Sequence, residues 1–158
     1  PDESTFSALL CACCHGGLVK DGREIFRRMK DEFCIQARTE HYVYMVKLLG
    51  MDGELEEAYN LILSLPEPVD CGIWGALLSC CDACGNSELA EIVSQQLFDD
   101  TPGKSAYRIM LSKIYAGNGR WDDVQKVRSD MTRDLRKMPG VSWIEASSNQ
   151  LLERCINS

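Results

Sequence analysis

The chain has 158 residues, a formal net charge of −7 and nine cysteines. Binding that depends mainly on neutralising phosphates needs clustered Lys and Arg, so this composition excludes it for the chain as a whole. No apolar run approaches the ~20 residues that a membrane span needs, and no membrane partner is expected.

The charge is unevenly distributed. Residues 1–70 carry 7 basic and 13 acidic side chains, and residues 71–103 carry five acidic side chains and no basic one. Residues 104–158 carry 10 basic and 6 acidic side chains. Any contact with nucleic acid is therefore expected to be local. The last two of these segments have opposite charge, which suits either docking against each other or two different partners.

An internal repeat is the most informative pattern. It opens with four aromatic residues at steps of 36, 32 and 33: Phe6, Tyr42, Trp74 and Tyr107. Apolar residues follow each of them three, four and seven positions later, which is one face of an α-helix. A glycine then ends each predicted helix, because glycine adopts the left-handed conformation of a tight turn. These glycines are Gly17, Gly53, Gly85 and Gly119.

A second helix is predicted after each glycine. Small residues recur five positions beyond it, where two helices can cross closely: Gly22, Ala58, Ala90 and Val124. The breaks between units fall at residues 35–38, 66–70 and 99–104. The pattern predicts an all-α fold, a right-handed α-solenoid of four helix-turn-helix repeats, whose function lies in a shared surface. We expect it to be a piece of a longer array.

The cysteines and histidines resemble chemical motifs only locally. Cys11–His15 spells the C-x-x-C-H signature of haem attachment, but Cys13 already belongs to the apolar face of a predicted helix. Two C-x-x-C pairs, Cys11/Cys14 and Cys81/Cys84, lie too far apart for a zinc ribbon. We therefore expect reduced thiols, no metal and no cofactor.

The sequence indicates a non-catalytic chain. Its two histidines, His15 and His41, have no nucleophile–base surroundings, and the H-x-E and P-C-x-x-C signature of a zinc deaminase is absent. No small-molecule substrate is expected. Trp74 and Trp121 lie in repeat register and are expected in the core. Trp143 lies beyond the last helical pattern and is expected to anchor the end of the stack.

Four stretches carry a resemblance to a known family. They are EHYVYMVKLLGMDG at 40–53, IWGALL at 73–78, YAGNGRWDDV at 115–124 and PGVSWIE at 139–145. Together with the uneven repeat lengths, they resemble plant organellar pentatricopeptide repeat proteins of the PLS class, over nearly the whole chain.

The resemblance implies a domain organisation. Residues 1–70 would hold the last two repeats, at about 3–38 and 39–70. Residues 71–145 would form the E region, with an E1 motif at 71–103, an E2 motif at 104–137 and a closing segment at 138–145. Residues 146–158 resemble neither this region nor a deaminase and are expected to form an irregular tail.

The resemblance also implies a function. The chain would be the C-terminal segment of an RNA-editing specificity factor in a mitochondrion or chloroplast. Its repeats would help bind single-stranded RNA, weakly in this fragment alone, and its E region would recruit or position a cytidine deaminase for C-to-U editing. The deaminase would belong to another domain or protein, and accessory editing proteins would be further partners.

Candidate site residues follow from the same resemblance, in which the fifth and last residues of a repeat face an RNA base. These are Ser7 and Arg38 in the first unit and Val43 and Asp70 in the second. Ser7 can bond a base edge, whereas Val43 cannot. Arg108, Lys113 and Trp143 are candidates for protein contact.

The alternative is a tetratricopeptide-like scaffold for protein–protein interaction without an RNA role, which would hold a peptide or helix in its groove. The sequence upstream of Pro1 discriminates between the two. Further units of roughly 31–36 residues with Asn, Thr or Ser fifth and Asp or Asn last favour RNA, and uniform 34-residue units favour the scaffold.

Overall fold

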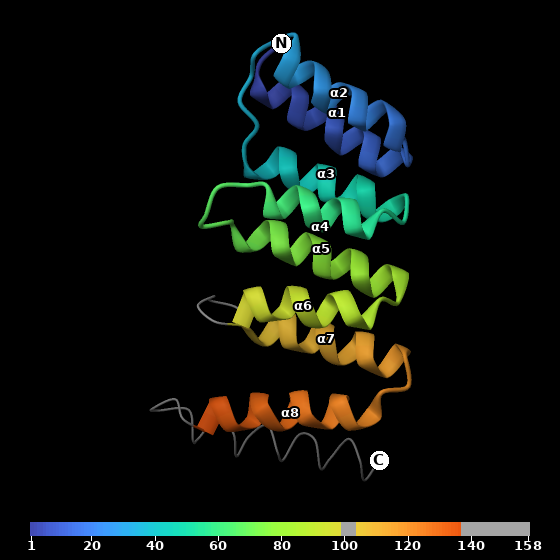
Figure 1. Cartoon of the computed structure of the whole chain (residues 1–158), viewed down its shortest axis with the longest axis vertical. Coiled ribbons are helices and arrows are strands. Elements are labelled where there is room, and N and C mark those ends of the chain that lie inside the picture. Colours follow the sequence, from blue (N-terminus) through green and yellow to red (C-terminus); the bar gives the residue numbers. More distant parts are fainter. Residues whose placement is uncertain (99–103, 137–158) are drawn as a thin grey trace, which may run out of the picture.

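The computed structural model describes residues 1–98 and 104–136, and these residues form one stack of helices with no β-strand among them (Figure 1). The predicted all-α solenoid is thus confirmed. The helices are α1 (Glu3–Gly16), α2 (Val19–Asp31), α3 (Thr39–Met51), α4 (Leu55–Leu63), α5 (Cys71–Cys84), α6 (Ser87–Phe98), α7 (Lys104–Gly117) and α8 (Trp121–Arg136).

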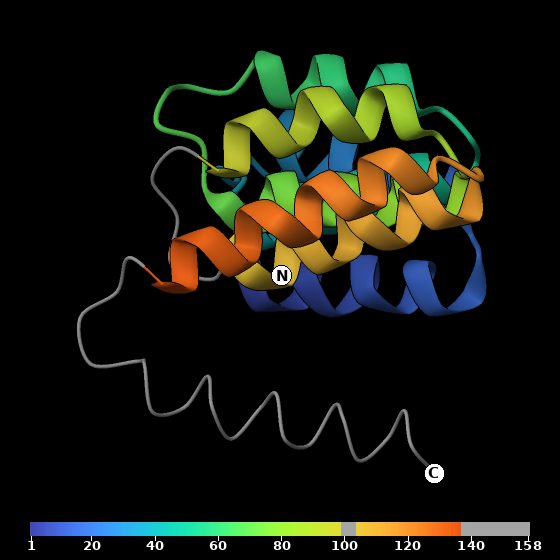
Figure 2. The same ribbon diagram turned by 90° about the horizontal axis from the view of Figure 1, so that it is seen from below.

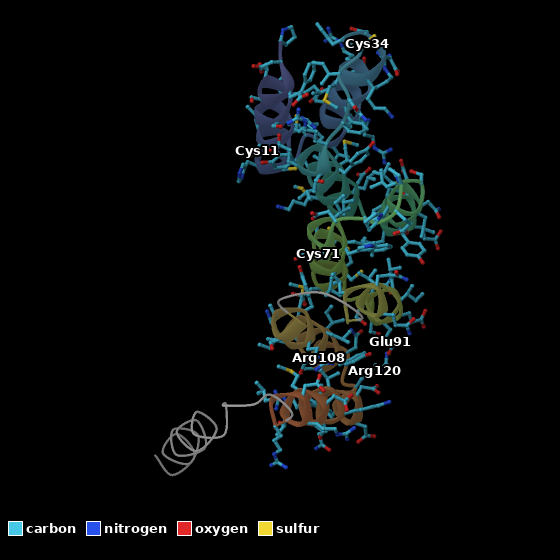
Figure 3. The ribbon with its side chains drawn as sticks, turned by 90° about the vertical axis from the view of Figure 1, so that its left-hand side faces the viewer. Cys11, Cys34, Cys71, Glu91, Arg108 and Arg120 are labelled. Atoms are coloured by element: carbon cyan, nitrogen blue, oxygen red, sulfur yellow. The ribbon has the colours of Figure 1, made fainter. Side chains whose placement is uncertain are left out.

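The first helices of successive pairs form a continuous row. Helix α1 packs on α3, α3 on α5 and α5 on α7, and we call these four helices the first-helix layer. The second helices α2, α4 and α6 each pack against their own first helix and against the first helix of the next pair. Figure 3 shows this arrangement from the side.

The predicted turns occur where the glycines stand. Gly17, Gly53, Gly85 and Gly119 have φ values of 67°, 79°, 69° and 71°, which is the left-handed region that favours glycine. Side chains cap several helix starts, among them Asp2 at α1, Asp70 at α5 and Asn86 at α6. Asp2 accepts from the Thr5 N–H at 2.9 Å, and this hydrogen bond lowers the pKa of Asp2.

The repeated aromatics lie in related surroundings along the core. Phe6 and Trp74 are buried, whereas Tyr42 and Tyr107 are half-buried. Tyr42 meets Phe26 of the preceding second helix with ring centroids 5.6 Å apart. Trp74 likewise meets an aromatic of α4, Tyr59, at 6.0 Å. Equivalent aromatics therefore join the second unit to the first and the third unit to the second.

The apolar residues three positions after each repeated aromatic are less uniformly buried than the pattern predicts. Leu9 is 42% exposed, whereas its equivalents Met45 and Leu77 are buried. The difference arises because no described helix precedes α1 and covers that side of it. The small residues at the helix crossings behave as predicted: Gly22, Ala58, Ala90 and Val124 are all buried.

Two glycines allow successive first helices to approach closely. A Cβ on Gly50 of α3 would lie 2.6 Å from the Cβ and 2.3 Å from the Sγ of Cys80 in α5. A Cβ on Gly75 of α5 would lie 2.9 Å from the ring of Tyr107 in α7. Neither distance is compatible with normal packing, so a larger residue would require Cys80 and its helix to shift at the first position and the Tyr107 ring to shift at the second.

No described helix combines the length and the hydropathy that crossing a bilayer requires.

We expect Gly50→Ala to lower the free energy of unfolding by about 1–3 kcal/mol, because its methyl group would overlap Cys80 across the α3–α5 contact. Urea denaturation followed by circular dichroism measures this. Gly117→Ala is the matched control, since nothing lies within 4 Å of its Cβ position. There we expect no loss and a gain of up to about 1 kcal/mol. Equal stability of the two variants would contradict the close packing.

Candidate nucleic-acid and protein interface

The candidate Ser7 takes part in a contact between the first two units. Its hydroxyl donates to the carboxylate of Glu40 at 2.5 Å and lies 3.0 Å from His41 Nε2. Both partners lie on α3, more than thirty residues further along the chain. The hydroxyl is therefore already bonded within the protein, and a base could use only its remaining acceptor capacity.

His41 is the polar centre of this contact, and it is fully buried. Its Nδ1 accepts from the backbone N–H of Arg38 at 3.0 Å. The neutral imidazole must then carry its proton on Nε2, which donates toward the Glu3 carbonyl at 3.2 Å and the Ser7 hydroxyl. This role could not be predicted from the sequence, where the only signal is a histidine beside the aromatic Tyr42.

The other base-facing candidates differ in availability. Arg38 is exposed, but its guanidinium pairs with Glu3 at 2.7 Å. Val43 is half-buried against the core and offers no polar atom. Asp70 is exposed and caps α5 by accepting from the Gly72 N–H at 2.7 Å. The structure brings Arg38 and Asp70 to one pocket of about 410 Å³, whereas Ser7 is tied to Glu40 and His41.

A second groove, of about 340 Å³, crosses α1, α3 and α5. Its apolar lining includes two thiols from the last turns of α1, and Lys47 is the lysine among the residues around it. Lys47 Nζ lies 6.0 Å from the ring centroid of Tyr44. The lining residues are Cys11, Cys14, His15, Tyr44, Lys47, Gly50, Met51, Ser79, Cys80 and Ala83.

The described cysteines are free thiols, and several are poor nucleophiles. Burial raises the pKa of Cys80 to about 11 and that of Cys81 to about 12. Burial also raises the pKa of Cys14, whose Sγ contacts the Tyr44 carbonyl at 3.5 Å. A raised pKa leaves few thiolates at neutral pH, so these residues act as small apolar side chains. Within residues 1–98 and 104–136, no cluster of three His, Cys, Asp or Glu could hold a metal ion.

Two of the three candidates for protein contact, Arg108 and Lys113, lie on α7 in the fourth helix pair. The Arg108 side chain is only 17% exposed and its guanidinium pairs with Asp134 of α8, which ties α7 to α8. Lys113 is exposed on α7. Trp143 lies outside the described residues. Lys113 is therefore the more accessible of the two described candidates.

A polar network that the sequence analysis did not identify joins α6, α7 and α8. The Arg120 guanidinium pairs with Glu91 at 2.6 Å and with Asp123 at 2.7 Å, and it lies 4.6 Å from the Tyr115 ring centroid. The buried Tyr115 hydroxyl donates to Glu91 at 2.9 Å. Burial, with this bond to a carboxylate, raises the pKa of Tyr115. Figure 3 shows Glu91 and Arg120 on the same side of the stack.

The prediction for Trp121 was wrong. Its side chain is 63% exposed rather than packed in the core. Trp121 is the first residue of α8, the last described helix, and no described helix lies beyond it to cover that flank. The register prediction assumed a neighbour on both sides of each unit. The prediction for Trp74 is confirmed, since it is buried.

Comparison with known proteins identifies two family models along the chain. The PPR repeat model matches residues 4–32, and the E motif model matches residues 85–145. Among curated proteins, the chain is 54% identical to a putative pentatricopeptide repeat-containing protein of Arabidopsis thaliana, over 90% of this chain and 26% of that protein.

Two further Arabidopsis thaliana relatives are also pentatricopeptide repeat-containing proteins. One is 44% identical over 96% of this chain and 22% of its own length. The other, named as mitochondrial, is 42% identical over 93% of this chain and 22% of its own length. The chain therefore spans about a quarter of the length of the curated relatives that it matches.

We expect His41→Ala to lower the free energy of unfolding by about 2–4 kcal/mol, because it removes a buried ring and leaves the Arg38 N–H without its acceptor. Urea denaturation measures this loss. His15→Ala is the control, since His15 is exposed at the end of α1 and should change stability by less than about 0.5 kcal/mol. A stable His41→Ala protein would show that the contact between the first two units does not need the imidazole.

Proposed function

We propose that this chain, which belongs to the pentatricopeptide repeat proteins that carry an E motif, is a segment of an RNA-editing specificity factor for organellar transcripts. In this proposal its helix pairs over residues 1–70 are pentatricopeptide repeats that extend an RNA-binding surface. Residues 71–145 are the E region, which recruits or positions a cytidine deaminase. The chain itself supplies no catalytic group.

The observation that carries the proposal is the unbroken first-helix layer. Helices α1 and α3 lie in the same row as α5 and α7, so that an RNA strand lying along the repeats would run directly toward the E motif. A partner bound to the E motif would then sit beside the nucleotides that follow the last base read by a repeat. This geometry supports a role in which the chain positions the partner relative to the RNA and supplies no catalytic group itself.

The charges on the first-helix layer favour contact with a protein over strong contact with RNA. Lys47 and Lys113 are exposed cations of the first-helix layer. Arg38 and Arg108 in the same layer pair with Glu3 and Asp134. Phosphate binding would have to compete with these ion pairs, so upstream repeats are expected to supply most of the RNA affinity.

A second candidate function is a protein-binding scaffold without an RNA role. The groove across α1, α3 and α5 favours it, because the lining is mostly apolar and such grooves accept a partner helix or peptide. The repeat lengths and fifth residues upstream of Pro1 discriminate between the two functions.

Residues 1–158 are expected to bind single-stranded RNA weakly, with a Kd on the order of 10⁻⁵–10⁻⁴ M that weakens further as salt is raised. Fluorescence anisotropy with labelled RNA measures this affinity, and the same segment preceded by its upstream repeats is the positive control. A tight, salt-insensitive affinity of residues 1–158 alone would contradict the proposal that upstream repeats supply most of the RNA affinity.

Residues 1–158 used as bait in nuclease-treated organelle extract should recover deaminase-bearing or accessory editing proteins. Lys113→Glu should reduce the recovery several-fold, because it reverses an exposed charge of α7. Lys20→Glu on α2 is the matched control, since Lys20 is also exposed. Failure to recover any such protein, identified by mass spectrometry, would count against the recruitment role.

A further inference from the structure

Helix α8 gathers its three arginines on one flank and three of its four aspartates on the other. The exposed Asp122 falls with the arginines, and Lys126 falls beside the aspartates. At about 100° per residue, Val124, Val127 and Met131 share the side that packs on α7. The acidic residues Asp123, Asp130 and Asp134 fall on one flank of that side. The basic residues Arg128, Arg133 and Arg136 fall on the other flank, together with Ser129 and Thr132.

The acidic flank is largely neutralised by the protein itself. Asp123 pairs with Arg120 at 2.7 Å. Asp134 pairs with Arg108, which comes from α7. These arginines bridge neighbouring helices, so that side of α8 is occupied by contacts within the stack.

The basic flank forms a shallow surface groove of about 400 Å³, lined by Arg128, Ser129, Thr132, Arg133 and Arg136. The Arg133 side chain is 67% exposed, and its acidic neighbour Asp130 lies 3.9 Å away, at the limit of an ion pair. Guanidinium and hydroxyl groups are the donors that proteins use for phosphate oxygens. The helix dipole disfavours an anion at this C-terminal turn, but its partial charge is smaller than that of the arginines.

The exposed Trp121 continues the same flank toward the start of α8. Residues 121, 125, 128, 132 and 136 follow one stripe of the helix surface, and the rise per residue puts Trp121 about 10 Å along the axis from Arg128. An exposed indole next to arginines is typical of single-stranded nucleic-acid sites, where a base stacks on the ring. Figure 2, which views the stack from below, has α8 toward the viewer.

We propose that this flank of α8, formed by Trp121, Arg128, Ser129, Thr132 and Arg133, binds the single-stranded RNA segment that extends beyond the repeats. Arg128 and Arg133 contact phosphates, and Trp121 stacks on a base. The inference rests on the proposed function and adds to it a substrate site outside the first-helix layer. An acidic protein surface would also attract the arginines and could pack on the indole, so it is the competing occupant that the polyglutamate comparison below tests.

The location agrees with the charge of the chain. Residues 104–158 have 10 basic and 6 acidic side chains, whereas the preceding segments are acidic. Helix α8 itself has four basic and four acidic side chains, so an RNA backbone repelled by residues 71–103 would be attracted by the arginine flank and not by a net charge of the helix. The contact is local, as the overall charge of −7 requires.

The test is fluorescence anisotropy of residues 1–158 with a labelled single-stranded RNA at low salt and over a salt series. Arg128→Glu/Arg133→Glu should weaken binding at least about tenfold and flatten the log–log salt slope by about one unit. Trp121→Ala should weaken it about fivefold or more through lost stacking. Lys20→Glu/Lys30→Glu on α2 makes the same charge change at exposed sites and should have less than about a twofold effect.

Circular dichroism confirms that each variant is folded, which is expected because Trp121 and both arginines are exposed. Equal weakening by the α8 and α2 double variants would overturn the inference, since net charge alone would then explain it. If the α8 variants lost binding to polyglutamate but bound RNA as well as the unchanged protein, the inference would be overturned in favour of an acidic protein partner. If RNA binds and the α8 variants have no effect, only this inference fails. If the chain binds no RNA at low salt, the RNA role of the fragment fails as well.

Discussion

The close approach of successive first helices is the constraint on which the rest of the structure depends. Gly50 leaves room for Cys80, and Gly75 leaves room for the Tyr107 ring, so that α3, α5 and α7 pack at short distance. In a stack held in this way, each first helix can pack against the next in only one position. Surface residues of different units then occupy defined positions relative to one another, which a flexible array could not provide.

Polar contacts between units use two of the side chains that the family resemblance made candidates for facing an RNA base. The hydroxyl of Ser7 and the exposed Arg38 are held by Glu40 and Glu3. Such contacts stabilise the boundary between units and also reduce the number of groups that can bind an RNA base.

The two ends of the stack differ in character. Near α1, α3 and α5 the surface has an apolar groove with few cations. Near α8 it has arginines on one flank and an exposed indole. The apolar groove suits the peptide or helix of the alternative scaffold function, and the arginine flank suits an anionic strand.

The helices, their turns and the packing rows were predictable from the sequence, because each depends on local periodicity or on the conformational freedom of glycine. The left-handed glycines Gly17 and Gly85 and the buried Ala58 illustrate this. The tertiary structure decided which polar groups are occupied and which aromatic side chains are exposed. The His41 network and the exposure of Trp121 depend on how helices from different parts of the chain are placed. Periodicity specifies which face of a helix is apolar, but it does not specify which neighbour covers each end of that face.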